Sequence, residues 1–239
     1  MKLLFSTAAL FLALITTAQT KTYNDPNAKA RTLSASFSKI SVGSGVELFL
    51  TQGNDEALAI SVSEPRFEER FKTEVENGTL KIWYDNKNWS KADKNRKLKA
   101  YVSYKTLDAL TCSSGSITKL TNTLNAGTLS MNFSSGCQFE GAIDAASVTS
   151  NANSGATVRI SGKAEKIKVE ASSGANFKGD QLNTSYCTAS ANSGASVSIA
   201  VQKELNASAN SGGDIRYSGN AVVTRGVINS GGSVKQRSK

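Results

Sequence analysis

Residues 129–178, LSMNFSSGCQFEGAIDAASVTSNANSGATVRISGKAEKIKVEASSGANFK, contain a Ser-Gly pair that is preceded by Ser or Asn three times, at a constant interval of 19 residues. The pair also recurs before and after this stretch, so that seven pairs follow one another at intervals of 18 to 21 residues. A repeat of this length is typical of a unit that buries its apolar face only by stacking on its neighbours. The serines of the seven pairs are Ser114, Ser135, Ser154, Ser173, Ser193, Ser211 and Ser230.

Within each repeat, apolar and polar residues alternate on both sides of the Ser-Gly pair. In one repeat Leu129, Met131 and Phe133 alternate with polar residues before the pair, and Phe139 follows it. Period-two alternation indicates strands with one buried and one wet face. Only Ser or Asn precedes each serine, which predicts a ladder of polar side chains, and the glycine permits a left-handed backbone. A propeller blade would need about forty residues, so the repeats predict an all-β fold, a single-stranded parallel β-helix with turns of about 19 residues.

The N-terminal segment, residues 1–18, is typical of a cleaved signal peptide. Lys2 gives it a basic start, and the run from Leu3 to Ile15 is apolar apart from two residues. This run is too short to span a membrane, and no later segment approaches twenty apolar residues. We therefore expect an exported chain without a transmembrane segment, in the periplasm, at the outer surface or secreted in a Gram-negative-type envelope. Residues 19–32 are interpreted as an N-terminal extension.

The remaining residues, 33–239, are predicted to form a single β-helix domain. Regular Ser-Gly turns should occupy 112–235, whereas 33–111 should form irregular early turns and the cap of the same solenoid. In this early part the Asn77-Gly78 pair predicts a hairpin turn. The polar tail, residues 235–239, is expected to end the stack without an exposed apolar edge.

The composition restricts the chemistry that the chain can perform. Its 239 residues include no histidine, which excludes Ser/His/Asp and Cys/His nucleophiles and the His-bearing zinc sites. The calcium nonapeptide, phosphate-loop and dinucleotide motifs are absent. Hydrolysis of glycosides needs two facing carboxylates, and the aspartates of the repeats do not share one aligned position. We expect no catalytic residues, no cofactor and no metal site, with a polysaccharide lyase or a glycoside hydrolase as the alternative.

Three cysteines, Cys112, Cys137 and Cys187, show no metal-type spacing. In an exported protein their odd number leaves at least one thiol unpaired. Their positions in the repeat favour small buried hydrophobic residues, and a disulfide between the first two is the alternative.

The net charge of +9 favours acidic partners such as polysaccharides, lipopolysaccharide phosphates or host glycosaminoglycans. One concentration of positive charge is the basic loop, residues 85–99. In this loop Trp89 stands among Lys91, Lys94, Arg96 and Lys97. An aromatic face can stack on a sugar ring while amines pair with carboxylates or sulfates, so the loop is a candidate contact for acidic glycans. A solvated loop without a ligand is the alternative.

The second concentration of positive charge is the basic stripe, which consists of Arg159, Lys178, Arg216 and Lys235. These residues occupy one aligned position after the Ser-Gly pair and should point outward, with Ser198 as an interruption. Like charges about 4.8 Å apart repel by about 0.9 kcal/mol in bulk water, so a regular stripe is mildly unfavourable without a counter-ion or ligand. The alternative is a wet face covered by long side chains.

Taken together, these patterns resemble the head GIN domain family of auto-transporter adhesins. The resemblance covers roughly residues 33–235 and consists of FSKISVGSGV at 37–46, NGTLKI at 77–82, LDALTCSSG at 107–115 and the Ser-Gly corners that follow. It implies an exported or envelope-associated β-helix of right-handed sense, and it brings no active-site motif.

We therefore expect a non-enzymatic, exported, adhesin-like head or surface-binding scaffold that recognises anionic glycans of the envelope or of a host. A self-associating structural envelope protein is a further alternative, and the oligomeric state is left open. Nucleic acid is not expected as a partner, because an exported protein rarely meets it.

Overall fold

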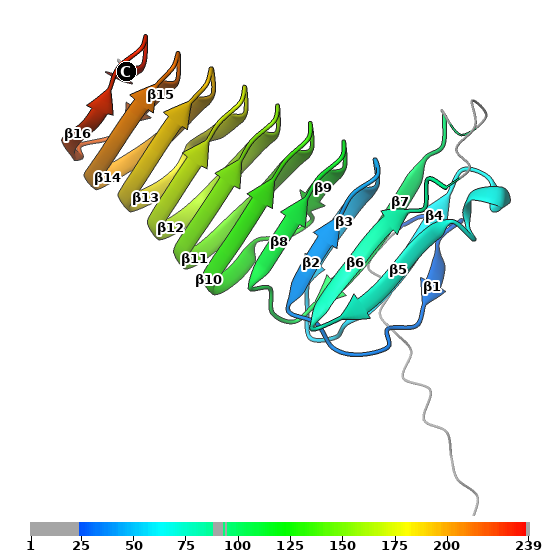
Figure 1. Ribbon diagram of the computed structural model, residues 1–239. Coiled ribbons are helices and arrows are strands. Elements are labelled where there is room, and N and C mark those ends of the chain that lie inside the picture. Colours follow the sequence, from blue (N-terminus) through cyan, green and yellow to red (C-terminus); the bar gives the residue numbers. More distant parts are fainter. Residues whose placement is uncertain (1–23, 88–92, 94, 238–239) are drawn as a thin grey trace, which may run out of the picture.

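The computed structural model describes residues 24–87, 93 and 95–237, and these form an all-β solenoid (Figure 1). Stacked parallel strands make about seven turns with a spacing of roughly 19 residues, which confirms the parallel β-helix. A short 3₁₀ helix, η1, spans Pro65–Phe67. The strands are β1 (Lys29–Arg31), β2 (Lys39–Val42), β3 (Glu47–Gln52), β4 (Ala57–Val62), β5 (Phe71–Glu76), β6 (Thr79–Tyr84), β7 (Leu98–Tyr104), β8 (Ala109–Cys112), β9 (Ile117–Leu120), β10 (Leu124–Phe133), β11 (Gln138–Ala152), β12 (Thr157–Ala171), β13 (Asn176–Asn192), β14 (Ser196–Asn210), β15 (Asp214–Ser218), β16 (Val222–Ile228) and β17 (Ser233–Gln236).

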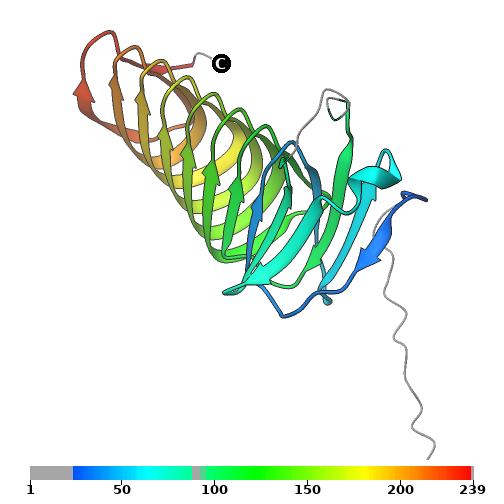
Figure 2. The ribbon, with the colours of Figure 1, turned by 45° about the vertical axis from the view of Figure 1, so that its right-hand side comes forward.

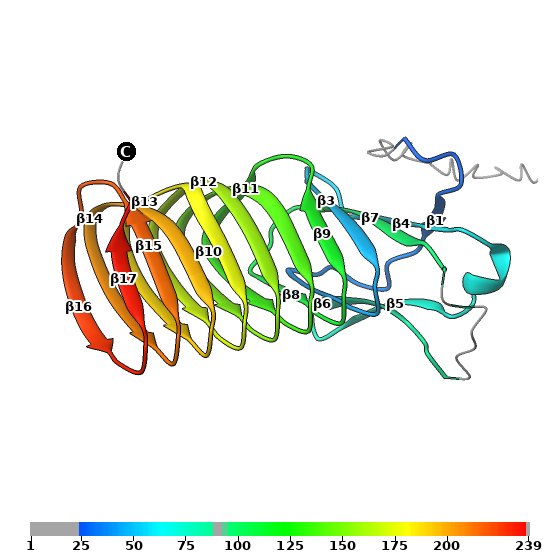
Figure 3. The same ribbon diagram turned by 90° about the horizontal axis from the view of Figure 1, so that it is seen from above.

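The solenoid has three faces, each built from parallel strands of successive turns. Face A contains β2, β6, β8, the C-terminal parts of β10–β14, and β16. Face B contains β3, β7, β9, the N-terminal parts of β11–β14, and β15 and β17. Figure 3 shows β3, β9, β15 and β17 of face B along one side of the stack. Face C consists of the start of β10 and the middle parts of β11–β14.

The Ser-Gly pairs form the corners between faces A and B. At one corner Ser154 has φ 50° and Gly155 has φ 73°, and the Ala156 amide donates to the Asn153 carbonyl at 3.1 Å. Two successive positive φ values with this hydrogen bond are the features of a type I′ turn. The sequence predicts the left-handed glycine but not the left-handed serine. Successive corners are joined by a backbone hydrogen bond, as from the Gly155 amide to the Ser173 carbonyl at 3.1 Å.

The interior is a stack of side chains that point inward from successive turns. These are the alternate residues that the sequence predicts to be buried. Phe139, Val158, Phe177, Val197 and Ile215 are paired in register from turn to turn, and all five are buried. On face A the inward positions just before the corners are mostly alanines, and Ala152, Ala171, Ala191 and Ala209 are all buried. The polar ladder is partly formed by side-chain hydrogen bonds, of which the Asn210 amide to Asn192 Oδ1 at 3.2 Å is one.

The three cysteines, Cys112, Cys137 and Cys187, are buried and unpaired. This confirms their interpretation as small buried hydrophobic residues, and the alternative disulfide is not formed. Burial raises the pKa of the Cys112 thiol and of the Cys187 thiol to about 12 each.

The early strands are not stacked in the order of the sequence. β2 and β3 meet at an eighth corner, Ser44-Gly45, and lie between the later pairs β6/β7 and β8/β9. Beyond β6 and β7 the sheets continue with antiparallel strands. β5 lies beside β6, β4 lies beside β7, and β1 lies beside β4. Asn77-Gly78 forms the predicted hairpin turn between β5 and β6, with φ of 49° and 69°. Figure 2 shows these antiparallel strands at the N-terminal end of the stack.

The last turn exposes apolar side chains, so the expectation of a stack that ends without an exposed apolar edge is wrong. Val222, Val227 and Ile228 of β16 are 73%, 61% and 39% exposed. Among the described residues no strand pairs with the far side of β16, which leaves the inward position of Ile228 uncovered. A polar tail cannot cover this surface because β17 lies on a different face.

The predicted signal peptide, residues 1–18, lies outside the described residues, as do residues 19–23 of the predicted extension at 19–32, whereas its later part contains β1, which pairs with β4. Both stay predictions. In the described part of the chain, no helix is long and apolar enough to cross a membrane.

Candidate functional site

The basic stripe forms one continuous column on face B. Strand register places Arg159 beside Lys178, Lys178 beside Ser198, and Arg216 beside Lys235. Ser198 is also paired with Arg216, so the column is interrupted once, as the sequence predicts. All four cations are exposed.

A groove of about 600 Å³ opens on face B around the first part of the stripe. Arg159 and Lys178 line it together with Lys119 and Glu140, and these four residues occupy adjacent positions of the same column. The groove also includes Asp180 of β13. Arg216 and Lys235 lie farther along the column and do not line it.

A bulge in β13 shapes one side of this groove. β12 and β13 are in register at Arg159–Lys178 and again at Ser161–Gln181, so β13 has one additional residue between these pairs. Asp180 lies at this irregularity and is exposed. Because a bulge bends its strand and redirects side chains, it brings a carboxylate to an edge of the groove that regular pairing would not.

Several charged groups in or near the groove have ion-pair partners. Arg216, the third member of the stripe, is held by the aspartate two residues before it. The pairs are Lys119–Glu47 at 3.0 Å, Arg216–Asp214 at 2.8 Å and Arg237–Asp180.

Arg159 and Lys178 are different, because neither has an ion-pair partner among the described residues. Glu140, on the next position of the column, also has none, so the unpaired groups of the groove carry two positive charges and one negative charge. Adjacent cations on rungs about 4.8 Å apart repel each other, and an anion placed between them would remove that repulsion. The groove is therefore suited to a carboxylate, sulfate or phosphate group.

Sequence reasoning missed two members of this column. Phe49 and Lys119 stand five residues after the serines of their own corners, as Arg159 and Lys178 do, and this common offset was the signal that could have found them. Lys119 Nζ lies 5.6 Å from the centroid of the Phe49 ring. The other face of Phe49 stacks on Tyr101, with ring centroids 5.1 Å apart. At this end of the column, Phe49 and Tyr101 are stacked on each other and Lys119 lies over the Phe49 ring.

The basic loop is only partly described by the structure. Trp89, Lys91 and Lys94 lie outside the described residues, so their candidate role stays a prediction. Arg96 and Lys97 are described, at the end of the loop that leads into β7.

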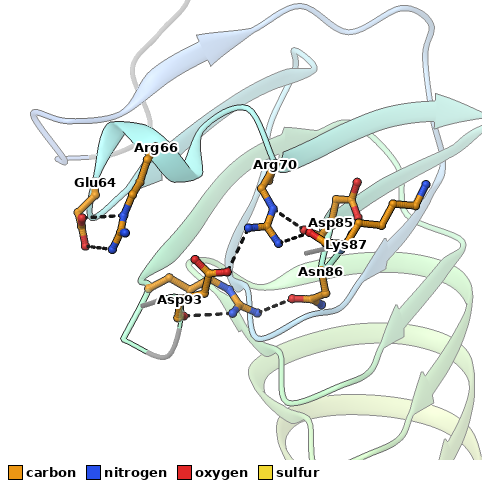
Figure 4. Close-up of polar contacts among 8 residues, drawn as sticks. Glu64, Arg66, Arg70, Asp85, Asn86, Lys87 and Asp93 are labelled. Atoms are coloured by element: carbon orange, nitrogen blue, oxygen red, sulfur yellow. Dashed lines mark hydrogen bonds and ion pairs between the residues drawn. The ribbon is translucent and has the colours of Figure 1, made fainter. Parts of the chain in front are cut away.

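Arg96 takes part in a cluster that holds both ends of the loop. Its guanidinium lies 4.4 Å from the centroid of the Tyr84 ring and donates to Asn86 Oδ1 at 3.2 Å. Arg70 lies over the same ring at 4.8 Å and forms an ion pair with the buried Asp93 at 3.1 Å. Figure 4 shows Arg70, Asn86 and Asp93 converging between the two arms of the loop. These contacts assign Arg96 to positioning the loop rather than to a free cationic surface.

Lys97 lines a separate pocket of about 340 Å³ together with Lys99, Asp25 and Tyr101. Burial raises the pKa of Asp25, but hydrogen bonds from the Tyr101 hydroxyl and the Asn27 backbone amide together lower the pKa by more than burial raises it. The net shift of the Asp25 pKa is therefore downward. Of the predicted site residues that the structure describes, Lys97 lines this pocket, Arg159 and Lys178 line the groove with Lys119 and Glu140, and Arg96 and Arg216 line neither.

Comparison with known proteins agrees with this architecture. Residues 36–221 match the family model described as "Putative auto-transporter adhesin, head GIN domain". The chain belongs to this family. The resemblance noted from the Ser-Gly corners and the early patterns is thereby confirmed, and no curated protein matches the chain.

Solved structures of similar fold support the assignment of the architecture. A structure titled a putative adhesin from Bacteroides fragilis has a TM-score of 0.78 at 15% identity, over 87% of this chain and 95% of that chain. A putative adhesin from Parabacteroides distasonis has a TM-score of 0.69 at 16% identity, over 88% and 96%. A putative lipid binding protein from the same species has a TM-score of 0.64 at 16% identity, over 90% and 98%. At these identities the likeness shows the fold alone.

Proposed function

We propose that this chain is an exported, non-enzymatic, adhesin-like head whose groove on face B binds anionic glycans of a cell envelope or host surface. The observation that carries this proposal is the adjacent pair Arg159 and Lys178, which line the groove without a carboxylate partner among the described residues. An anionic group between them would exchange repulsion for charge-assisted hydrogen bonds. The net charge of +9 adds a long-range attraction for polyanions.

The direction of the column favours a polymer over a small ion. Its rungs follow the solenoid axis at spacings of about 4.8 Å, so a chain with repeated anionic groups can lie along it. Arg216 and Lys235 continue the column past Ser198. Once a polymer is bound at one cation, its next anionic group is held at a high effective concentration near the next cation, so each contact raises the overall affinity. Arg216 would have to exchange Asp214 for the ligand, so it should contribute less than Arg159 or Lys178.

Binding without chemistry is supported by the carboxylates of the groove. Asp180 is paired with Arg237, and Glu140 lies between the cations Lys119 and Arg159 in the column. A hydrolase needs one carboxylic acid and one carboxylate that face each other across the scissile bond. Here each carboxylate instead lies beside a cation, and Asp180 is held in an ion pair.

The test is retention of the mature chain by a sulfated polysaccharide, a polyuronate and a neutral polysaccharide, with polymer length measured in the same samples. We expect retention by the two acidic polymers that declines from about 0.05 M to about 0.5 M NaCl, because salt screens exposed charges. The double variant Arg159→Ala/Lys178→Ala should lose most of this retention by the acidic polymers. Lys105→Ala/Lys163→Ala, which removes the same charge elsewhere, is the matched control.

Equal losses in the two double variants would show that net charge alone is responsible and would refute the groove. Shortening of the polymer would refute the non-enzymatic assignment. The basic loop is tested separately with Lys91→Ala/Lys94→Ala, and a loss of retention in this variant would make the loop a second contact for the same ligand.

A further inference from the structure

An exposed aromatic ring on face A needs an explanation that the groove on face B does not provide. Four large hydrophobic residues are strongly exposed among the described residues, and three of them are on β16, where no further strand covers them. The fourth is Tyr186 of β13, which is 36% exposed although β12 and β14 flank it on both sides. Its exposure therefore follows from its outward position in the sheet and not from an end of the stack.

Tyr186 stands at the centre of a grid of polar side chains. Register places it between Lys166 and Glu204, and these residues line a groove of about 300 Å³ with the ring. A second, parallel column beside the ring supplies hydroxyl and amide groups to the same groove. This column contains Thr149, Lys168, Thr188 and Asn206.

A local irregularity fixes the ring in this position. β13 and β14 are in register at Thr184–Val201 and at Tyr186–Glu204, so β14 has one additional residue between these pairs. Lys203 belongs to this insertion, and its Nζ lies 5.3 Å from the centroid of the Tyr186 ring. A cation over an aromatic face is attractive, so Lys203 restricts the ring on one side.

Adjacent rungs on either side of the ring carry opposite charges, in contrast to the two adjacent cations on face B, and Lys203 over the ring adds one positive charge. Lys166 and Glu204 flank the ring with opposite signs, and Lys168 is paired with Glu170 at 2.8 Å. This groove therefore lacks the pair of adjacent unpaired cations that favours a polyanion on face B. It instead combines one apolar ring face with many hydroxyl and amide groups, the combination that suits a molecule with apolar CH surfaces and many hydroxyls.

We propose that the groove around Tyr186 is a second binding site, separate from the one on face B, and that it takes a chain of neutral sugars. A pyranose ring stacks on Tyr186, and the neighbouring sugar units of the polymer form hydrogen bonds with Thr188, Asn206, Lys166 and Glu204. The inference goes beyond the proposed function, because it needs neither the basic stripe nor an anionic ligand. It also gives the head two faces with different glycan chemistry.

The experiment is titration of the full mature chain with soluble neutral polysaccharides, namely a β-glucan, a mannan and a galactan, followed by affinity electrophoresis and calorimetry. Salt is kept at about 0.5 M, where the Debye length of about 4 Å suppresses the site on face B. We expect Tyr186→Ala to weaken binding of at least one polymer by about 3- to 10-fold, whereas Tyr186→Phe stays close to the unchanged chain, because the ring face and not the hydroxyl makes the contact.

Thr128→Ala is the matched control, since Thr128 lies in the same column but outside the groove. Absence of binding to every neutral polymer overturns the proposal, and so does Tyr186→Ala binding as well as the unchanged chain. Tyr186→Phe as weak as Tyr186→Ala overturns the stacking contact. Loss of neutral-glycan binding in Arg159→Ala/Lys178→Ala overturns the separation of the two sites, whereas unchanged binding there supports it even if no anionic glycan binds face B.

Discussion

Replacing Lys178 by serine should stabilise the unliganded solenoid at low ionic strength, because it removes repulsion from Arg159 on the adjacent rung. At a spacing of about 4.8 Å, two like charges repel by about 0.9 kcal/mol in bulk water. At about 0.15 M salt the Debye length of about 8 Å leaves roughly half of this energy. Serine fits the column, since Ser198 already occupies the next position.

The assay is urea unfolding of the unchanged chain, Arg159→Ser, Lys178→Ser and the double variant at about 0.01 M and about 1 M NaCl. Urea is uncharged and therefore does not screen the pair. The double-mutant cycle isolates the pairwise term, and we expect a repulsive coupling of about 0.5–0.9 kcal/mol at low salt that disappears at high salt.

Arg216→Ser is the control, because Arg216 is already paired with Asp214 at 2.8 Å. Its replacement should leave stability unchanged or lower it slightly, as is usual for an exposed ion pair. A coupling between Arg159 and Lys178 of zero, or one that persists at high salt, would refute the reasoning. It would mean that the two side chains spread apart in solvent and that the groove does not concentrate positive charge.

Three further outcomes follow from backbone, packing and burial. Gly162→Ala should lower the free energy of unfolding by about 3 kcal/mol, since the added Cβ would lie 2.1 Å from a carbonyl oxygen. Gly155→Ala has open space around the added Cβ and should cost only about 1–2 kcal/mol, because of its positive φ. Chemical denaturation of the two variants measures the difference. Asp93→Asn removes a charge that pairs with a half-buried arginine, and limited proteolysis should cut the basic loop faster while the melting temperature of the solenoid changes little. The thiols of Cys112 and Cys187 should resist alkylation at pH 8 until the chain unfolds. Because their pKa values are raised from 9.0 to about 12 by folding, stability should be retained below pH 9 and decline as the pH rises toward 12; rapid labelling of the folded chain would contradict this.

The regular half of the solenoid was predictable because its information is local and repeated. Each turn carries its own Ser-Gly corner and its own alternation, and parallel stacking then places equivalent residues such as Phe139, Val158 and Phe177 one above another. The column of Arg159 and Lys178 followed from the same argument, as aligned positions in the sequence become neighbours in space.

The early strands could not be ordered in this way. β2 and β3 lie between strands that follow them in the chain, and β4 and β5 run antiparallel, so their neighbours depend on long-range pairing and not on a repeat. The corner at Ser44-Gly45 was the local sign that this half belongs to the same stack. Its place in the stack depends on which sheet edges are available, and a sequence without a regular interval does not encode that in any short segment.

The same distinction applies to the candidate sites. Sequence periodicity was sufficient to place the basic stripe in one column, because register in a solenoid follows from the repeat length. That Lys178 has no ion-pair partner although Asp180 is two residues away was not accessible, since Asp180 lies at a bulge and pairs with Arg237, 57 residues later in the chain. The contact between Lys203 and the Tyr186 ring was equally inaccessible, because it depends on one additional residue in β14. Bulges and ion pairs are balances of energies among neighbours in space, so they emerge only when the turns are stacked.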